Sequence, residues 1–454
     1  MKEFTPEYIK NIRDIIAAHD ELGARRELTD LHPADIAELY QDLDLEEAEF
    51  LYRLLDDDTA ADVLMELDED DRAKLLSNMP AEMIARQFID HLDTDDAVDI
   101  IQELEEEQRD DVLSHIDDVG QASDIIDLLK YDEDTAGGLM STEMIVVNEN
   151  WSMPECIKQM RMQAEDRDEI YYVYVVDDDN KLRGILPLKT LITNPSVSKI
   201  KHVMEVDPVS VKTDTPIDDV SLDFEKYDLV AMPVVDSIGR LVGHITVDDV
   251  LDEMRESSER DYQLASGLSS DVDADDSIIA QTKARIPWLL LGILGGILAS
   301  MILGSFEDQL AAVTALALFI PIIGGTGGNV GVQASAIVVQ GLANGSLDIK
   351  EFGKQMWKEI VIGLLNATVM TAVIFIYNVI AMPGDWSVTL SVAVSLFTVV
   401  MFSSIFGTLV PLTLEKMHIN PALATGPFIQ ISNDIIGLII YVYVAKLFLS
   451  IFGV

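Results

Sequence analysis

The stretch FIPIIGGTGGNVGVQ, residues 319–333, decides how this 454-residue chain folds. It lies inside a long apolar segment, yet it carries Pro321 and glycines at 324, 325, 327, 328 and 331. In a bilayer, non-helical backbone survives only where protein buries it or where it lines a wet cavity. Glycine also lets the backbone face a passing solute. We therefore expect this stretch to interrupt a membrane helix and to line a transport pathway. The alternative is close helix packing through small residues.

Five apolar segments follow residue 286, at about 287–304, 310–342, 360–382, 387–414 and 421–453. Four reach the roughly 20 residues that cross a bilayer and the first comes close, so we expect five membrane spans. The turns at 305–309 and 383–386 carry no Lys or Arg, whereas Lys350, Lys354, Lys358 and Lys416 fall on the opposite side. The positive-inside rule then predicts a multi-pass protein of the cell (plasma or inner) membrane, with cytosolic N-terminal domains and the C-terminus outside.

The last span contains a single acid, Asp434. A carboxylate at the centre of a bilayer costs about 3 kcal/mol on insertion scales, so Asp434 should face an ion path or a partner. The alternative is a protonated Asp434 that pairs with a hydroxyl such as Ser432. One acid among backbone carbonyls suits hard cations such as Mg²⁺, Ca²⁺ or Mn²⁺. The sequence shows no ATPase motif, so we expect passive flux driven by the membrane potential.

The charge of the chain is concentrated before the membrane segments. The net charge is −49, and all but 8 of the 80 acids lie before Arg285. Such acidity argues against binding to nucleic acid, which needs a basic face. The one cysteine, Cys156, excludes an internal disulfide, and the seven histidines show no paired spacing typical of a zinc enzyme. We therefore expect a protein that is not an enzyme and whose folded acidic half responds to cations.

Residues 1–130 carry leucine-type anchors about every 12 residues, each followed by an acidic or proline-containing start. This pattern predicts short capped helices that must stack into a solenoid to bury their apolar faces. Asp95 and Asp99 lie four residues apart on one predicted helix face, where a divalent cation would remove their repulsion.

An internal repeat follows: residues 170–192 match residues 230–254, with Gly184 and Gly243 in equivalent places. Each copy predicts strand, acidic turn, strand and helix, and the pair resembles tandem cystathionine-β-synthase-type (CBS) modules. In that family the turn after the second strand can hold ATP or another adenine nucleotide, and the resemblance places such a site at Gly243, Thr246 and Asp249. The alternative is a simple helix cap made by Thr246 and Asp248.

The sequence thus predicts a multidomain fold: an all-α helical-repeat solenoid, an α/β tandem CBS pair and an α-helical transmembrane domain of five spans. The expected boundaries are an acidic helical-repeat N domain at 1–130, CBS module 1 at 131–200, CBS module 2 at 201–255, a connecting (plug) helix and linker at 256–285, and a transmembrane pore domain at 286–454.

The chain as a whole resembles the MgtE family of magnesium channels. The most specific motifs are YDEDTAGGLMS (131–141), PIIGGTGGNVGVQ (321–333) and the segment from Pro421 to Asp434. The resemblance implies a homodimer in the lipid bilayer, with the pore at the dimer interface and no obligatory partner of another kind. It also implies passive, Mg²⁺-selective influx that closes when cytosolic Mg²⁺ is high.

The resemblance also assigns site residues. Those of the ion path are Asp434, Gly325, Gly328, Asn329 and Gln430. The cytosolic regulatory Mg²⁺ ligands are Asp62, Asp95, Asp99, Asp218, Asp228, Asp249, Asp252 and Asp261. The chain departs from the family pattern at five positions. It has Val332 where the family often has Asn, Asn420 where it has Asp, Gly426 where some members have a polar residue, and Ser257 and Arg260 where some members have acids. Glu256 and Glu259 lie close enough to replace the acids missing at 257 and 260.

A gating hypothesis follows from the charge: Mg²⁺ bound among the cytosolic acids would hold a compact, closed state. Two other hypotheses stay open. One is a transporter of Co²⁺, Ca²⁺ or Mn²⁺ with the same architecture. The other is a nucleotide sensor whose spans only anchor it; the expected break in the second span and Asp434 argue against this, because an anchor needs neither.

Overall fold

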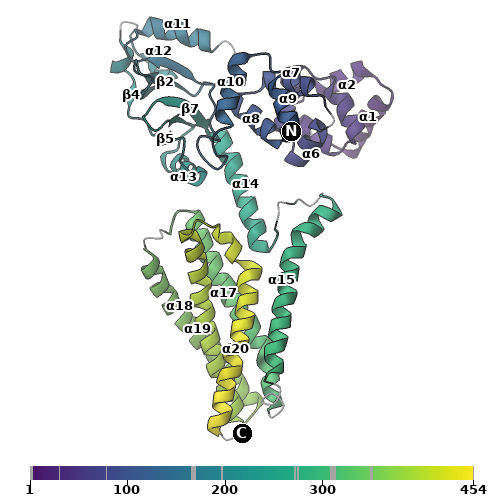
Figure 1. The fold of residues 1–454 in the computed structure, drawn as a ribbon, viewed down its shortest axis with the longest axis vertical. Helices are drawn as coiled ribbons and strands as arrows, with labels where there is room; N and C mark the ends of the chain where they lie inside the picture. Colours follow the sequence, from purple (N-terminus) through teal and green to yellow (C-terminus); the bar gives the residue numbers. More distant parts are fainter. Residues whose placement is uncertain are drawn as a thin grey trace. The chain divides into compact units, whose positions relative to one another are not determined.

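The computed structural model describes residues 4–29, 31–77, 79–164, 170–195, 198–269, 272, 276–306, 313–347 and 351–452. The chain divides into two compact units, Met1–Asp252 and Glu253–Val454. Figure 1 labels their helices and strands along the chain.

The first unit begins with the predicted stack of short helices. Each apolar side is buried, and acidic residues open most of the helices, as in the Asp44–Glu47 capping box of α4. The expected anchors Leu67, Leu92 and Leu104 belong to the buried core. The helices are α1 (Pro6–Ala17), α2 (Glu21–Leu28), α3 (Pro33–Gln41), α4 (Leu45–Tyr52), α5 (Asp57–Met65), α6 (Glu69–Leu76), α7 (Ala81–Gln87), η1 (Ile89–His91), α8 (Thr94–Glu103), α9 (Glu106–Leu113) and α10 (Val119–Leu128).

Two small sheets follow, and they confirm the predicted repeat. In each module a parallel pair of strands is followed by an antiparallel partner, with a register shift at Val175/Val176 and again at Val234/Val235. One sheet has the order β1-β2-β3-β4 and the other β5-β6-β7. The elements are β1 (Ile145–Asn148), α11 (Met153–Gln163), β2 (Tyr172–Val176), β3 (Leu182–Pro187), α12 (Leu188–Thr193), η2 (Ile200–His202), β4 (Glu205–Val206), β5 (Val211–Lys212), α13 (Ile217–Tyr227), β6 (Ala231–Val235) and β7 (Leu241–Thr246).

The motif at 131–141, which joins the helical stack to the CBS modules, pairs by backbone hydrogen bonds with the second module. The amide N of Ala136 donates to the carbonyl O of Thr215 at 2.8 Å, and Ser141 exchanges two backbone hydrogen bonds with His244 of β7 at 2.8 and 2.9 Å. The expected boundary placed this segment at the start of module 1, and the segment leads within a few residues into β1 of that module. Its long-range backbone pairing with the second module is a feature that local sequence cannot show.

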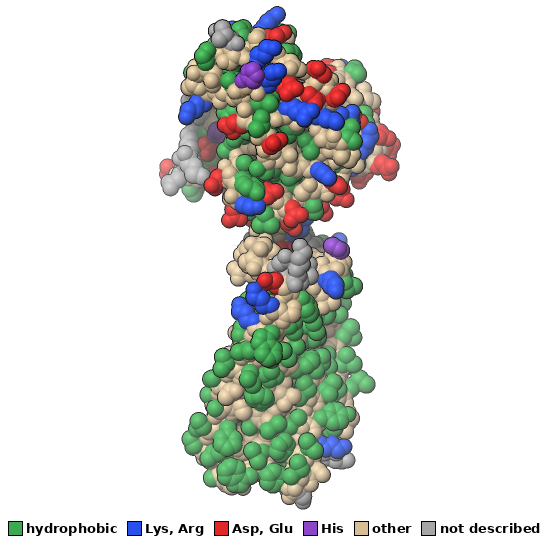
Figure 2. Space-filling view, turned by 90° about the vertical axis from the view of Figure 1, so that its left-hand side faces the viewer, with side chains coloured by type: hydrophobic (Ala, Val, Ile, Leu, Met, Phe, Trp, Pro, Cys, Tyr) green, Lys and Arg blue, Asp and Glu red, His purple; other side chains and the backbone are tan. Residues whose placement is uncertain are grey.

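The second unit holds the membrane helices. It includes the later part of α14 (Val247–Ser266), then α15 (Ile278–Gly304), η3 (Thr314–Phe319), α17 (Ile320–Ala343), α18 (Phe352–Ala381), α19 (Trp386–Lys416), η5 (Pro421–Ala424) and α20 (Gly426–Phe452). Five described segments are long and apolar enough to cross a membrane, as predicted. Figure 2 shows hydrophobic side chains over these helices and charged ones over the other unit. Residues 278–285, expected in the linker, are the first turns of α15.

The predicted break in the second span is wrong. α17 is a continuous helix through all five glycines, and the irregular part is the 3₁₀ segment η3 just before it. Pro321 lies in the first turn of α17, where a missing N–H costs nothing. Glycine lowers helix propensity by about 1 kcal/mol, but packing of the neighbouring helices outweighs that.

Candidate functional site

The carboxylate of Asp434 faces two glycines of α17. Its Oδ1 lies 3.4 Å from the place of a Cβ on Gly324 and 3.5 Å from that on Gly328. The two glycines are one turn apart, so α17 offers the acid bare backbone. Among the residues that the structure describes, none forms a hydrogen bond or ion pair with Asp434; Ser432, the partner of the alternative hypothesis, does not bond to it. A half-buried carboxylate in this setting needs a cation or water.

Two other glycines of α17 serve packing. A Cβ on Gly327 would lie 2.7 Å from Val399 Cγ1 of α19. A Cβ on Gly331 would overlap the amide of Asn433, and one on Gly407 of α19 would overlap the Gly331 carbonyl. The alternative of close helix packing therefore applies to this face of α17. Gly325 has open space beside it, since no atom lies within 4 Å of its would-be Cβ.

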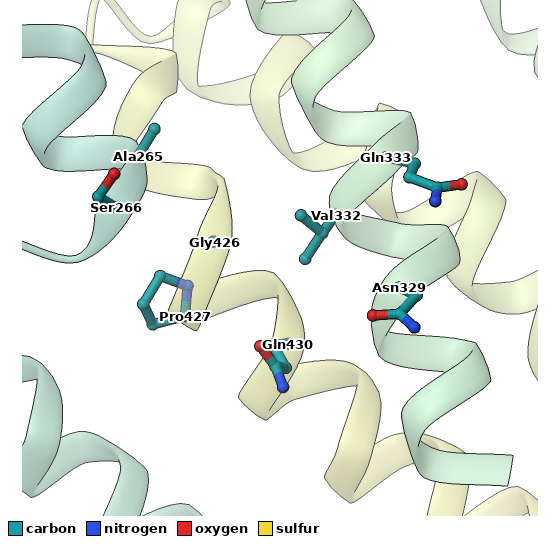
Figure 3. Close-up of a pocket in the computed structure, with 8 residues that line it drawn as sticks. All are labelled: Ala265, Ser266, Asn329, Val332, Gln333, Gly426, Pro427 and Gln430. Carbon is teal, nitrogen blue, oxygen red and sulfur yellow. The ribbon is translucent and has the colours of Figure 1, made fainter. Parts of the chain in front are cut away.

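A cavity of about 420 Å³ opens beside the same helices. Figure 3 shows its lining: the last residues of α14, the start of α20, and one side of α17, from which Val332 projects. Three amide side chains give it oxygen and nitrogen donors without charge, a lining that suits a hydrated cation. The lining residues are Ala265, Ser266, Asn329, Val332, Gln333, Gly426, Pro427 and Gln430.

The last turn of α14 is fastened to the start of α20. Asn420 Nδ2 donates to Asp261 Oδ1 at 2.8 Å. Gly426 has φ +38°, and a Cβ there would overlap the carbonyl of Ala265. Gly267, with φ +84°, lies so close to Pro427 that its Cβ would be 2.6 Å from the ring. Two departures from the family pattern, Asn420 and Gly426, thus make direct contacts with the connecting helix. We name the set Asp261, Ala265, Gly267, Asn420 and Gly426 the α14 seat.

A cluster of carboxylates lies in the first unit where α8 and α14 begin. The cluster comprises Asp93, Asp95, Asp96, Glu143 and Asp249. Burial, and then the charge of neighbouring acids, raises the pKa of Asp95 well above its usual value and that of Asp96 to about 7. Burial also raises the pKa of Asp249. Asp95 Oδ1 is buried without a hydrogen-bond partner. Such carboxylates repel one another, and a divalent cation shared by two of them would lower that repulsion.

Glu143 fastens the helical stack to the segment before β1. Its Oε2 accepts from the Thr94 hydroxyl at 2.7 Å and from the Ser141 hydroxyl at 2.8 Å, and from the Thr94 backbone amide at 3.3 Å. The carboxylate therefore caps the first turn of α8, next to Asp95 and Asp96.

The three residues expected to bind a nucleotide make different contacts in the structure. A Cβ on Gly243 would lie 2.7 Å from the Ser141 carbonyl, so this glycine admits the neighbouring backbone. Both the amide and the hydroxyl of Thr246 donate to Asp249 Oδ2. The helix cap of the alternative hypothesis is present, but Asp249 makes it and not Asp248.

The remaining expected ligands are spread over several elements. Asp99 and Asp252 lie near the carboxylate cluster, since their charges raise the pKa of Asp96 and Asp249. Asp62 lies on α5, Asp218 in the first turn of α13 and Asp228 at its left-handed C-cap. Over the described ranges, no three His, Cys, Asp or Glu side chains are arranged so that they could hold a metal ion by themselves.

Sequence reasoning missed several residues. Asp93, Asp96 and Glu143 join the cluster through a fold that brings residues 48 or more positions apart together. The adjacency of Asp96 to Asp95 was the available signal. Glu359, which is buried in α18 and accepts from Ser404 of α19, lay one residue before the expected third span.

Comparisons with known proteins now decide the family. The magnesium transporter MgtE of Thermus thermophilus is 37% identical over 330 residues, which are 71% of this chain and 72% of that protein. This chain belongs to the MgtE family. The MgtE of Bacillus subtilis is 30% identical over 322 residues, 71% of each protein. The matching family models are MgtE, described as a divalent cation transporter, at 320–444, the MgtE intracellular N domain at 31–134, and the CBS domain at 136–196 and 200–256.

Solved structures agree for the first unit. A crystal structure of the cytosolic domain of the Mg²⁺ channel MgtE in complex with ATP is 33% identical, with a TM-score of 0.51, and the match covers 54% of this chain and 99% of that one. The soluble part of a magnesium transporter is 29% identical, with a TM-score of 0.50, covering 56% and 98%. MgtE proteins are transporters and not enzymes, and with five apolar spans this chain is a membrane protein with a multidomain fold, as expected.

Proposed function

We propose that this chain carries Mg²⁺ passively across the membrane, along a path between α17 and α20 with Asp434 as its one acid. The observation that carries the proposal is the Asp434 carboxylate, which faces the bare backbone of Gly324 and Gly328. Gly325, Gly328, Asn329 and Gln430 would supply backbone and amide oxygens to a largely hydrated ion. The membrane potential supplies about 4.6 kcal/mol per 100 mV for a divalent ion that enters a negative interior.

The test is uptake into vesicles. Full-length protein in liposomes with an internal Mg²⁺ dye should show uptake that Asp434→Asn and Asp434→Ala abolish. The control is Lys446→Gln, because Lys446 is exposed on α20, whereas Asn433 beside Asp434 is buried. Undiminished flux in Asp434→Ala would reject the path. Competition by Co²⁺, Ca²⁺ and Mn²⁺ separates the proposal from the alternative of another divalent ion.

A homodimer is part of the proposal. Asn329, Gln333 and Gln430 are exposed on membrane helices, where amide groups facing lipid would be costly. A second copy that covers this face would turn it into the wall of a wet pore. In a Cys156→Ser background, Asn329→Cys should form an intermolecular disulfide, whereas Trp357→Cys, on the exposed side of α18, should not.

Regulation by Mg²⁺ is proposed at the carboxylate cluster. Two carboxylates among Asp95, Asp96 and Asp249 would hold the ion together with water molecules, and its positive charge would offset the repulsion among these buried acids. Asp95 Oδ1, which is buried without a hydrogen-bond partner, supports this. Without it, repulsion favours separation of α8 from the start of α14, and the pore-open state. Protease sensitivity of the cytosolic part should therefore fall as Mg²⁺ rises, and should stop responding in Asp96→Asn. Cytosolic placement of these domains follows from the positive-inside pattern and is tested by protease access in oriented vesicles.

Adenine nucleotide binding at the second CBS module is a further part of the proposal. The solved relative with bound ATP supports it. Thr246→Ala removes a hydroxyl from the expected site, so calorimetric titration with ATP should show weaker binding than in the unaltered chain.

A further inference from the structure

A buried acid in the membrane domain stands outside the proposed ion path. Glu359 of α18 is 6% exposed, and its Oε1 accepts a hydrogen bond from the Ser404 hydroxyl of α19. α17 and the membrane-spanning part of α19 before Glu415 contain no titratable side chain. Burying a carboxyl group is costly unless it is hydrogen-bonded, so the bond to Ser404 bears directly on how α18 and α19 pack.

The bond that Ser404 makes is unusual for its helix. Hydroxyls in membrane helices commonly bond to their own backbone. On α19, Thr389, Ser391, Thr398 and Thr413 each donate to the carbonyl four residues earlier, at 2.6 to 2.9 Å. Ser404 is as fully buried as Ser391, but it donates across to α18. Gly363, one turn after Glu359, brings the α18 backbone close, since its Cβ would lie 3.0 Å from Ser404 Oγ.

The adjacent face of α19 touches the glycine-rich helix α17. Ser403 Oγ would lie 3.2 Å from a Cβ on Gly327, and Gly407 meets the Gly331 carbonyl. Ser403 and Ser404 are neighbours that point to different helices. The Glu359–Ser404 bond therefore fixes the rotation of α19 that places Ser403 and Gly407 against α17. The same broad, glycine-rich face of α17 presents Gly324 and Gly328 to Asp434.

We propose that Glu359 is a positioning residue for ion selection: through Ser404 it holds α19, and through α19 it sets the position of the Gly324–Gly328 face opposite Asp434. The inference rests on the proposed function and adds to it a residue that does not touch the ion. A loss of the bond shifts α17 against α20 and loosens the geometry that favours the small, strictly octahedral Mg²⁺ over the more adaptable Ca²⁺.

The test is the ratio of Ca²⁺ to Mg²⁺ uptake in liposomes that hold the full chain. Glu359→Ala and Ser404→Ala should each raise the ratio by about tenfold, which corresponds to about 1.4 kcal/mol, near the value of one hydrogen bond. The double variant should be no worse than either single one. Glu359→Gln keeps an acceptor oxygen for Ser404 and should restore the ratio. Ser391→Ala, the same change at a buried hydroxyl of α19 that bonds to its own helix, is the matched control.

Some outcomes would overturn the inference. An unchanged ratio in Glu359→Ala would do so, as would equal effects of Glu359→Gln and Glu359→Ala, or an additive double variant. A merely destabilised protein lowers both fluxes in proportion and leaves the ratio unchanged. If the unaltered chain passed no Mg²⁺, the proposed function would fail. Thermal unfolding of the unaltered chain, the two single alanine variants and the double variant would then still show whether residues 359 and 404 are coupled.

Discussion

Asn420→Asp is the sharpest test of how α14 is held. The change replaces the amide that donates to Asp261 at 2.8 Å with a second carboxylate. Repulsion between two charges about 4 Å apart is about 1 kcal/mol in water and about 4 kcal/mol at an effective dielectric constant of 20. Asn420 is exposed, so the lower value applies, and the lost hydrogen bond adds about 1 kcal/mol. The total of about 2 kcal/mol shifts the equilibrium between the seated and the released end of α14 by about 30-fold.

Spin labels report this equilibrium. Tyr262 on α14 and Met417 after α19 are well exposed, so cysteines there, in a Cys156→Ser background, accept labels. The unaltered chain should give one narrow distance distribution with or without Mg²⁺. Asn420→Asp should give a broad distribution in EDTA and a narrow one with Mg²⁺, because a divalent cation can bridge two carboxylates.

Asn420→Ala is the control, since it removes the hydrogen bond without adding a charge. Its distribution should broaden less than that of Asn420→Asp and should not narrow with Mg²⁺. The reasoning is refuted if Asn420→Asp shows the same distribution in EDTA as the unaltered chain, or if Mg²⁺ leaves its broad distribution unchanged.

Three further predictions concern other parts of the molecule. Gly426→Ala should release α14, because its Cβ would overlap the Ala265 carbonyl, and the same spin labels should show a broad distribution that Mg²⁺ does not narrow. Gly331→Ala should lower thermal stability by about 1–3 kcal/mol through overpacking against Asn433, whereas Gly325→Ala, with open space, should keep or raise it. The metal-free first unit should lose stability as pH rises through about 7, since the raised pKa of Asp96 means that the folded state binds its proton more tightly than the unfolded state. That contribution is complete below about pH 4 and is lost above pH 7; thermal melts at pH 5.5 and 8 should show it, and Asp96→Asn should remove it while the exposed Asp110→Asn should not.

Periodic patterns predicted much of the fold. The 12-residue recurrence of anchors gave the helical stack, the repeated strand–turn–strand gave both modules, and hydropathy gave the five spans. Each of these signals is local, because a short helix or strand must place its own apolar side inward. The two sheets have register shifts at equivalent positions, so the sequence repeat corresponds to a repeat in backbone geometry.

Residue composition alone could not show which glycines do what. A run such as GGTGGNVG is compatible with a broken helix or with a tightly packed one. The choice depends on neighbours from α19 and α20 that lie 70 to 110 residues away. In the structure Gly327 and Gly331 admit side chains and backbone of those helices, while Gly324 and Gly328 face Asp434.

Polar pairs across long distances were also hidden from the sequence. Glu359 fell outside the expected span because hydropathy places the edge of an apolar run only within a few residues, and its partner Ser404 is 45 positions away. The carboxylate cluster likewise joins α8 to residues 143 and 249. A pairing of this kind depends on how helices rotate against one another, which is set by the packing of the whole core.

The backbone pairing of residues 135–141 with the second module has a mechanical consequence. Residues 135–141 run from the helical stack to β7, and β7 is followed directly by α14. A displacement of the acidic stack can therefore reach the start of α14 through these backbone hydrogen bonds, besides reaching β1 along the chain. Surface changes on module 1 that leave these hydrogen bonds in place would therefore preserve the link between the helical stack and α14.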